Sequence, residues 1–309
     1  MAQNSSYLLT GETGFLGLIL SKVLAENGFI VKGFKLFSEP LKADISSPFI
    51  IKKDLNVDAI IHAAGKAHIV PRNPEEEKAF FDVNFEGTKN LCAALDQLNT
   101  KPKSFIFIST VSVYGLDSGS LITEDHPLKG KTPYAKSKIL AEEWLADWAK
   151  SNGVKLCILR VPLIAGINPP GNLGAMINGI KSGKYLSIGK ATARKSIVWA
   201  EDIARVIPNL VDVEGIFNLT DGIHPSFGEL EEVISQALGK KKPFSIPIIV
   251  GKLLGKVGDI LGRRFPINSD KLNKITSTLT FDDARARNVL DWKPSSVLNK
   301  MSETLKLNE

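Results

Sequence analysis

The chain has 309 residues, of which 43% are hydrophobic and 23% charged, and these proportions are ordinary for a globular protein with one large α/β domain and a smaller partner. No apolar run reaches the ~18 residues of a membrane span, and no positive charge precedes the first apolar stretch as in a signal peptide. We therefore expect a cytoplasmic protein. The two cysteines lie in apolar surroundings and the four histidines lack metal-ligand spacing, so neither a disulfide nor a metal site is predicted.

Short apolar runs alternate with helical patterns through the first half of the chain. The predicted strands are Tyr7–Thr10, Ile30–Phe34, Ala59–His62, Ser104–Ser109 and Lys155–Val161, and the predicted helices are Leu16–Asn27, Phe80–Leu98 and Pro133–Asn152. Because continuous apolar strands between helices form parallel sheets covered on both faces, the pattern predicts a doubly wound parallel α/β sheet. The stretch between Phe37 and Asp58 has no clear pattern, so one crossover is expected to be abbreviated.

After Pro162 the composition changes, with loop signals at Pro169-Pro170-Gly171. We expect residues 1–164 to form the first domain and residues 165–309 a smaller C-terminal α/β region. This region has predicted helices at Phe227–Leu238 and Pro247–Leu261 and a predicted strand at Thr278–Phe281. The segments Ser196–Val206 and Gly215–Leu219 are expected to return to the main sheet.

A glycine-rich turn, Gly11-x-x-Gly14-x-x-Gly17, joins the first predicted strand to the first predicted helix. Such glycines let a backbone approach a pyrophosphate, which the free N–H groups of the helix N-terminus then bind. We therefore predict a dinucleotide at Gly11, Gly14, Phe15, Leu16 and Gly17.

The second predicted strand ends without the acidic residue that would hold the ribose 2′-hydroxyl of NAD. Lys32 or Lys35 could meet a 2′-phosphate instead, which slightly favours NADP over NAD. The alternative is that a backbone group or Ser38 holds the ribose.

Tyr134 and Lys138 lie four residues apart in Tyr134-Ala-Lys-Ser-Lys138, on one face of the helix that Pro133 begins. A free phenol has a pKa of about 10 and is a poor base at neutral pH. A neighbouring ammonium stabilises the phenolate and lowers that pKa. Tyr134 can then take a proton from a substrate hydroxyl while a hydride leaves the same carbon.

The glycine turn and the Tyr/Lys pair, in this order and about 120 residues apart, resemble the extended short-chain dehydrogenase/reductase family, in particular its nucleotide-sugar epimerase/dehydratase branch. Further matches are Phe105–Gly115, Arg160–Gly166 and Arg194–Ala204, so the resemblance covers nearly the whole chain. It implies a Rossmann-type fold in which Thr110 completes a catalytic triad with Tyr134 and Lys138. It also implies cofactor contacts at Asp44, Ile45, His62, Ala63, Ala64 and Asn84, and substrate contacts at Ser112, Asn172 and either Arg194 or Lys195.

The resemblance leaves several reactions open. Dehydratases of the branch carry one or two carboxylic residues after the catalytic hydroxyl, whereas Thr110 is followed by Val111 and Ser112. The favoured interpretation is therefore a UDP-sugar 4-epimerase, and the alternative is an NADPH-dependent 4-keto-sugar reductase. A neutral-alcohol dehydrogenase would leave Asn172 without an anion to bind, and a non-catalytic cofactor sensor would leave Thr110, Tyr134 and Lys138 without a role.

Residues 239–274 carry nine basic side chains and two acidic ones within a net charge of +6. An anionic substrate could use Arg263, Arg264 and Lys271 there, and few aromatic residues are interleaved, so no nucleic acid partner is expected. The helix Pro247–Leu261 could bind a membrane surface, although the pattern favours a core-packed amphipathic helix. Apolar residues on Phe80–Leu98 and Pro133–Asn152, including Trp144 and Trp148, predict a homodimer.

Overall fold

The computed structural model describes residues 5–34, 38–39, 44–67, 69–261 and 268–307. The elements in the first half of the chain are β1 (Ser6–Thr10), α1 (Phe15–Glu26), β2 (Ile30–Gly33), β3 (Ser38–Glu39), β4 (Ile50–Ile51), β5 (Ala59–His62), α3 (Pro74–Phe81), the π-helix η1 (Asp82–Glu86), α4 (Gly87–Leu95), β6 (Ser104–Thr110), the 3-10 helix η2 (Val111–Tyr114), β7 (Gly119–Ile122) and α5 (Pro133–Asn152).

The remaining elements are β8 (Lys155–Val161), β9 (Leu163–Ala165), α6 (Gly171–Lys181), β10 (Ser187–Ile188), β11 (Ile197–Trp199), α7 (Ala200–Val206), the 3-10 helix η3 (Ile207–Leu210), β12 (Gly215–Asn218), α8 (Phe227–Ala237), β13 (Ser245–Ile246), α9 (Ile248–Leu261), α10 (Ser269–Thr276), β14 (Leu279–Phe281), α11 (Ala284–Leu290) and α12 (Val297–Leu307).

Six strands form one parallel sheet in the order β12-β8-β6-β5-β1-β2, which confirms the predicted fold class. After β2 the chain crosses to the other side of β1, so the strand order reverses between β1 and β5. The crevice at the carboxyl ends of strands at such a switch point is where open α/β sheets bind ligands. Thr10 and His62 end the two strands that flank it.

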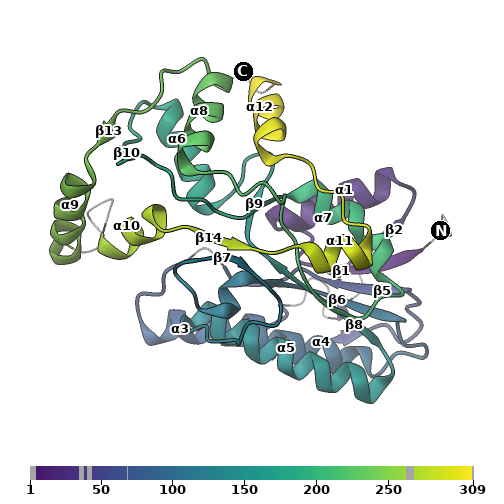
Figure 1. Ribbon diagram of the computed structural model, residues 1–309. Coiled ribbons are helices and arrows are strands. Elements are labelled where there is room, and N and C mark those ends of the chain that lie inside the picture. The colour runs from purple at the N-terminus through teal and green to yellow at the C-terminus, as the bar shows by residue number, and fades with distance from the viewer. Residues whose placement is uncertain (1–4, 35–37, 40–43, 68, 262–267, 308–309) are drawn as a thin grey trace.

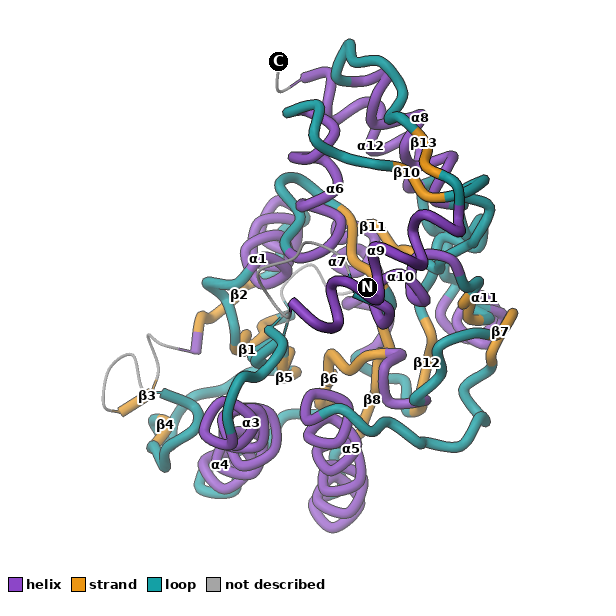
Figure 2. Tube along the Cα trace, turned by 90° about the vertical axis from the view of Figure 1, so that its left-hand side faces the viewer, coloured by secondary structure: helices purple, strands orange, loops and turns teal. Residues whose placement is uncertain are grey.

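Helices cover both faces of this sheet (Figure 2). Helices α1 and α7 pack on one face around Leu20, Leu24 and Ile203, and α4 and α5 pack on the other around Leu91 and Leu145. The strands contribute side chains to both cores. They therefore read as continuous apolar runs rather than as alternating ones.

The C-terminal region has a core of its own, built from α6, α8 and α12 (Figure 1). Of the two segments expected to join the main sheet, Gly215–Asn218 does so as its edge strand β12. Ile197–Trp199 instead pairs with β9 in a separate two-stranded sheet, while α7, which follows it, packs on α1.

The helix predicted at Phe80–Leu98 begins earlier than expected, at Pro74. Asn73 caps it by accepting a hydrogen bond from the Glu76 N–H at 2.8 Å. A π-helical turn then interrupts the helix at Asp82–Glu86 before α4 continues it. The apolar period does not reach the polar first turn, so the sequence pattern placed the start of this helix wrongly.

Helix α9 also differs from the favoured prediction of a core-packed helix. The residues it buries are Gly251, Gly255 and Gly258. Its large apolar residues, among them Ile249 and Ile260, are exposed.

Candidate active site

The backbone of the glycine turn lies so close to neighbouring backbone that side chains do not fit at two of its glycines. Gly11 has φ +76°, and a Cβ added there would lie 2.6 Å from the backbone nitrogen of Ala64. A Cβ on Gly17 would lie 2.0 Å from the carbonyl oxygen of Gly11. Neither position tolerates a side chain, so glycine is required at Gly11, where the loops after β1 and β5 meet, and at Gly17, where α1 packs on the glycine turn.

Helix α1 begins directly after this turn. Gly14 caps it without a side chain, and its first turn contains no acidic residue. The N–H groups of such a first turn have no partner within the helix and present positive charge. They fit a pyrophosphate. The Phe15 ring packs against Gly166.

His62 is fully buried and both of its ring nitrogens are engaged. Nδ1 lies 2.7 Å from the Thr10 hydroxyl, and Nε2 lies 2.8 Å from the Thr88 hydroxyl. Thr88 donates its own proton to the Asn84 carbonyl at 2.7 Å, so it accepts from Nε2–H. Nδ1 is then the acceptor of the Thr10 proton.

Burial, with a smaller effect of Lys138, lowers the pKa of His62 to about 3, so the ring is neutral. The Thr10 oxygen also accepts from the Ala64 N–H at 3.2 Å. The His62 side chain therefore positions the Ala63–Ala64 backbone against Gly11. A role of His62 in cofactor binding acts through that backbone.

Asn84 sits in the π-helical turn and is 1% exposed. Its amide binds both backbone groups of Lys66, accepting from N–H at 2.7 Å and donating to the carbonyl at 3.1 Å. It also donates to the Ser137 hydroxyl at 2.9 Å. Asn84 thus fastens the loop after β5 to α5, the helix that carries Tyr134 and Lys138.

Thr110 and Tyr134 come together at the carboxyl end of β6. Burial raises the pKa of the Tyr134 phenol, and a hydrogen bond with the Thr110 side chain acts in the opposite direction. The Tyr134 ring is partly exposed and packs on Phe80, with ring centroids 6.2 Å apart. Ser112 is exposed, and its hydroxyl oxygen lies 3.2 Å from that of Thr110.

Lys138 is 4% exposed, and its ammonium donates to the Ile108 carbonyl at 2.8 Å. Burial lowers its pKa to about 8, while Glu142 one turn later opposes that shift. A Cβ on Gly65 would lie 3.5 Å from the Lys138 Nζ. The ammonium is therefore directed at the loop after β5, beside the cofactor crevice.

The end of β2 holds a group that sequence reasoning missed. A Cβ on Gly33 would lie 3.3 Å from the Cγ and 3.4 Å from a carboxylate oxygen of Glu12. An acid is thus present at this position, but it comes from the glycine turn instead of from β2. Of the two lysines considered for a 2′-phosphate, Lys32 donates to the Asn56 carbonyl at 3.0 Å, and Lys35 lies outside the described residues.

Asp44 and Ile45 border the same side of the sheet. Asp44 accepts hydrogen bonds from the N–H and hydroxyl of Ser46 at 3.0 and 2.9 Å. The Ile45 side chain packs over Gly87, and its carbonyl accepts from Asn90 at 3.0 Å. Both residues are therefore fixed in place by α4 and by their own turn.

The two cationic candidates for the substrate end have different environments. Arg194 is turned toward α8, where it donates to the His224 carbonyl at 2.9 Å and pairs with Glu229 at 3.3 Å. Lys195 is partly buried, and burial lowers its pKa to about 8, with Asp117 opposing and Lys274 reinforcing the shift. Asn172 is exposed in the first turn of α6.

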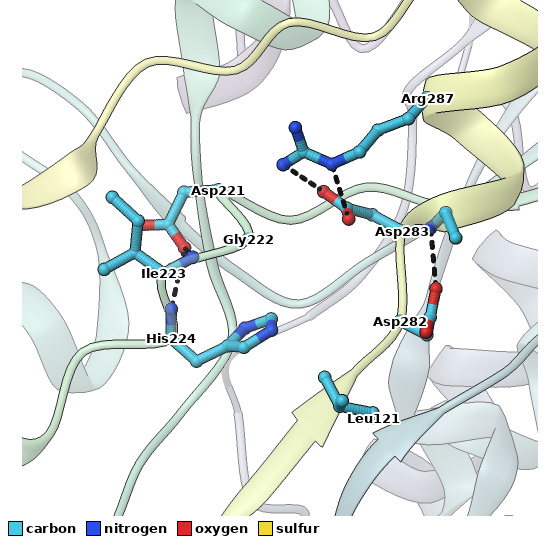
Figure 3. A pocket seen from close by; sticks show the side chains of 9 residues that line it. Leu121, Asp221, Gly222, Ile223, His224, Asp282, Asp283 and Arg287 are labelled. Atoms are coloured by element: carbon cyan, nitrogen blue, oxygen red, sulfur yellow. Dashed lines mark hydrogen bonds and ion pairs between the residues drawn. The ribbon is translucent and has the colours of Figure 1, made fainter.

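His224 also lines a surface hollow of about 490 Å³ between the Asp221–His224 turn and the start of α11 (Figure 3). Asp221 accepts hydrogen bonds from the Ile223 and His224 N–H groups, and Asp283 pairs with Arg287 at 2.9 Å. Arg194 contacts this hollow's lining through its hydrogen bond to the His224 carbonyl.

In the part of the chain that the structure describes, no group of three or more His, Cys, Asp or Glu side chains is arranged to hold a metal ion. Cys92 and Cys157 are free and buried.

The glycine turn at the switch point and the hydroxyl, phenol and ammonium groups next to it define a nicotinamide-dinucleotide enzyme of the short-chain dehydrogenase/reductase type. The model of the NAD dependent epimerase/dehydratase family matches residues 7–218, and the chain belongs to that family.

Relatives with assigned names extend the similarity along the whole chain. A UDP-glucose 4-epimerase from Vibrio cholerae is 29% identical, with 96% of this chain and 92% of the relative covered. An N-acetyl-alpha-D-glucosaminyl-diphospho-ditrans,octacis-undecaprenol 4-epimerase from Escherichia coli O157:H7 is 26% identical, with 98% of this chain and 95% of the relative covered.

Solved structures share the fold. The UDP-glucose 4-epimerase of Thermotoga maritima with UDP-glucose superimposes with a TM-score of 0.74 at 19% identity, covering 98% of this chain and 99% of the other. RMD from Pseudomonas aeruginosa, complexed with NADPH, also gives a TM-score of 0.74, at 20% identity and 98% coverage of both chains.

Proposed function

We propose that the protein is an NAD(P)-dependent 4-epimerase of a nucleotide diphosphate sugar, with UDP-sugars the favoured class. The observation that carries this proposal is the cluster of Thr110, Tyr134 and Lys138 beside the glycine turn, with no carboxylate in the two positions after Thr110. The names of the Vibrio and Thermotoga relatives support the choice of substrate class.

In the proposed reaction Tyr134 accepts the proton of the sugar 4-hydroxyl while Thr110 hydrogen-bonds the same oxygen. The Lys138 ammonium favours the phenolate that this step needs. A bound nicotinamide would supply the acceptor for the hydride from C4 and the donor that returns it to the opposite face of the 4-keto sugar. Tyr134 then gives the proton back, so sugar and cofactor show no net oxidation.

A second candidate is an NADPH-dependent reductase of a nucleotide 4-keto sugar, which needs the same three groups. It is favoured by the absence of an acid on β2 itself. The two reactions differ in their net consumption of NADPH. The reductase consumes one NADPH for each product molecule, whereas the epimerase consumes none.

Turnover of UDP-glucose deuterated at C4 tests both. The epimerase gives UDP-galactose that retains deuterium at C4, without added NADPH, as seen by NMR. The reductase leaves this substrate unchanged and oxidises NADPH only when a 4-keto sugar is supplied. Conversion of neither type across UDP-, dTDP- and GDP-sugars, together with firm dinucleotide binding, would favour a cofactor-sensing protein instead.

The choice between NAD and NADP belongs to the same proposal. The sequence slightly favoured NADP through Lys32 or Lys35. The position of Glu12 supports NAD, because a carboxylate beside the ribose accepts from a 2′-hydroxyl and repels a 2′-phosphate. We propose that Glu12 takes the role that an acid on β2 usually has.

We also propose that residues 1–164 bind the dinucleotide, that residues 165–309 supply most of the substrate side, and that the protein is a cytoplasmic homodimer.

Two apolar side chains of α5 support the dimer, because they are partly exposed on the surface of the single chain. Leu140 is 37% exposed and Trp144 is 39% exposed. Trp148 does not contribute, since it is buried and donates to Asp96 at 3.1 Å. A monomeric mass by light scattering at micromolar concentration would contradict the dimer.

A further inference from the structure

Helix α9 packs against the rest of the protein through small residues. A Cβ on Gly251 would lie 2.9 Å from the Ile188 side chain, and one on Gly255 would lie 3.3 Å from the backbone of Ser269. With Gly258, these glycines make up the buried face of the helix. The close approach they allow leaves no room for large side chains on that face.

The large apolar side chains of α9 consequently face away from the protein. Ile249 is 69% exposed, Leu253 60% and Ile260 84%, and the residues lie at spacings that place them on one side of a helix. Val250, Val257 and Leu261 extend this side, and Phe244, just before β13, is 74% exposed. We call Phe244, Ile249, Val250, Leu253, Val257, Ile260 and Leu261 the α9 apolar face.

This arrangement is the reverse of an ordinary surface helix, which turns its apolar side inward. Contiguous exposed apolar residues mark a surface that another body covers. Helices α9 and α10 lie at one extremity of the molecule, away from the six-stranded sheet, so a large flat body can reach the face (Figure 1).

Most of the exposed charges around the α9 apolar face are positive. Lys252 and Lys256 are exposed on α9, and Lys240 and Lys241 are exposed just before Phe244. None of these four lysines forms an ion pair with the residues that the structure describes. The acid on α9, Asp259, is engaged with the N–H and hydroxyl of Ser269. Lysines bordering an apolar helix face are the pattern that binds anionic lipid surfaces.

We propose that the α9 apolar face and its flanking lysines dock the protein on an anionic phospholipid bilayer, with α9 lying in the plane of the headgroups. Because α9 lies at an edge of the C-terminal region, away from the six-stranded sheet (Figure 1), docking places this region next to the membrane. Arg263 and Arg264 lie outside the described residues. The proposed docking relies on the α9 apolar face and the four lysines named above.

The docked helix is close to the candidate substrate end. Leu272 of α10 approaches within 3.4 Å of a Cβ placed on Gly251. Lys274, two residues further along α10, is near enough to Lys195 to affect its pKa. One short helix therefore separates the bilayer surface from Lys195, one of the two candidate cations for the substrate's phosphates. Docking would present this end of the site to the lipid surface.

Co-sedimentation of the full-length protein with vesicles tests the proposal. Phosphatidylcholine vesicles containing phosphatidylglycerol should pellet the protein, pure phosphatidylcholine vesicles should pellet much less, and added salt should weaken the binding. Leu253→Ser with Ile260→Ser should reduce the bound fraction about ten-fold, by loss of apolar burial. Lys252→Glu with Lys256→Glu should also release the protein from the anionic vesicles.

Matched control variants carry the same chemical changes elsewhere. Val289→Ser removes a half-exposed apolar residue of α11, and Lys53→Glu with Lys150→Glu makes the same charge change on other elements. Both should bind vesicles like the wild type. Dinucleotide binding by each variant, measured without lipid, shows that the fold is intact.

Two outcomes would overturn the proposal. One is equal pelleting of the wild type and both α9 variants. The other is a change of the molecular mass in light scattering on Leu253→Ser with Ile260→Ser, without vesicle binding by the wild type, which would make the face a contact between copies of this chain. Turnover of soluble UDP-sugars without lipid is measured separately, so failure of the proposed reaction does not affect this test.

Discussion

The guanidinium of Arg160 lies 2.7 Å from a carboxylate oxygen of Glu142, and both side chains are almost completely buried. Arg160 comes from β8 and Glu142 from α5, one turn after Lys138. The same guanidinium donates to the Glu124 carbonyl at 3.1 Å and to the Tyr114 hydroxyl at 3.2 Å. This buried ionic network thus fixes α5, the helix that carries Tyr134 and Lys138, to the sheet.

Glu142→Gln should destabilise the protein strongly. It keeps the shape of the side chain but leaves the Arg160 charge buried without a counter-ion, a change that costs about 3–5 kcal/mol. Urea unfolding measures the loss. Glu143→Gln, at an exposed neighbouring position, should stay within about 0.5 kcal/mol of the wild type. Equal stability of the two variants would mean that the Arg160–Glu142 ion pair contributes nothing to the free energy of unfolding.

Tyr134→Phe should lower turnover by at least about 100-fold, the minimum commonly lost with a general base. The phenyl ring can still pack on Phe80, so dinucleotide binding should change by no more than a few-fold. Calorimetric titration of the cofactor alongside steady-state kinetics separates the two effects. Activity above a tenth of wild type would exclude Tyr134 as the proton acceptor.

Lys138 should make the stability of the protein depend on pH. Its pKa is about 8 in the folded protein and 10.5 in the unfolded chain, because burial disfavours the ammonium. Between these values the unfolded chain holds more protons, so this residue raises the free energy of unfolding as pH rises, by about 3 kcal/mol at most. Below pH 8 the buried charge costs stability.

Comparison with Lys138→Met isolates this contribution. The unfolding free energy of the wild type minus that of the variant should increase from pH 8 to pH 10, in urea titrations at each pH. Lys136→Met, an exposed change on the same helix, serves as the control. A difference that stays flat or falls with pH would show that Lys138 is not buried as a charged group.

Local chemistry made much of the fold predictable. Helix α5 begins and ends where expected because Thr132 caps it, Pro133 occupies its first position and Gly153 ends it with φ +64°. The strands β5 and β8 also have the predicted bounds, since each is a largely apolar run. The order of the strands and their switch point then place the glycine turn beside α5.

Contacts between distant parts of the chain were harder to predict from the sequence. Sequence spacing identified Tyr134 and Lys138 because they share one helix face, but it could not show that Thr88 holds His62 or that Glu12 reaches Gly33. Helix α9 shows the same limit. Periodicity shows which residues share a face, whereas which face is inward depends on what the helix packs against, and here the glycines pack.

Glu12→Ser should shift cofactor preference toward NADP. The substitution removes a carboxylate from the end of β2, where a 2′-phosphate would otherwise meet a like charge. We expect the ratio of NADP to NAD affinity to rise about ten-fold, corresponding to ~1.4 kcal/mol. Calorimetric titration of both dinucleotides measures it, with Thr13→Ser as a neighbouring control. An unchanged ratio would show that Glu12 does not face the ribose.

Arg194→Ala and Lys195→Ala should have different effects on the binding of UDP. The Arg194 guanidinium already donates to the His224 carbonyl and pairs with Glu229. Lys195 is partly buried beside Asp117 and Lys274, in the kind of confined environment where a charged ligand binds strongly.

If Lys195 contacts the diphosphate, Lys195→Ala should weaken UDP binding by about 2–4 kcal/mol, the range for truncating one partner of a buried charge pair. Arg194→Ala should change it by less than about 1 kcal/mol, because it removes an exposed ion pair with Glu229 of α8. Calorimetry with UDP alone measures both without any turnover. A larger loss with Arg194→Ala would reverse the assignment, and no loss with either variant would remove the main support for a nucleotide-sugar substrate and favour a neutral alcohol.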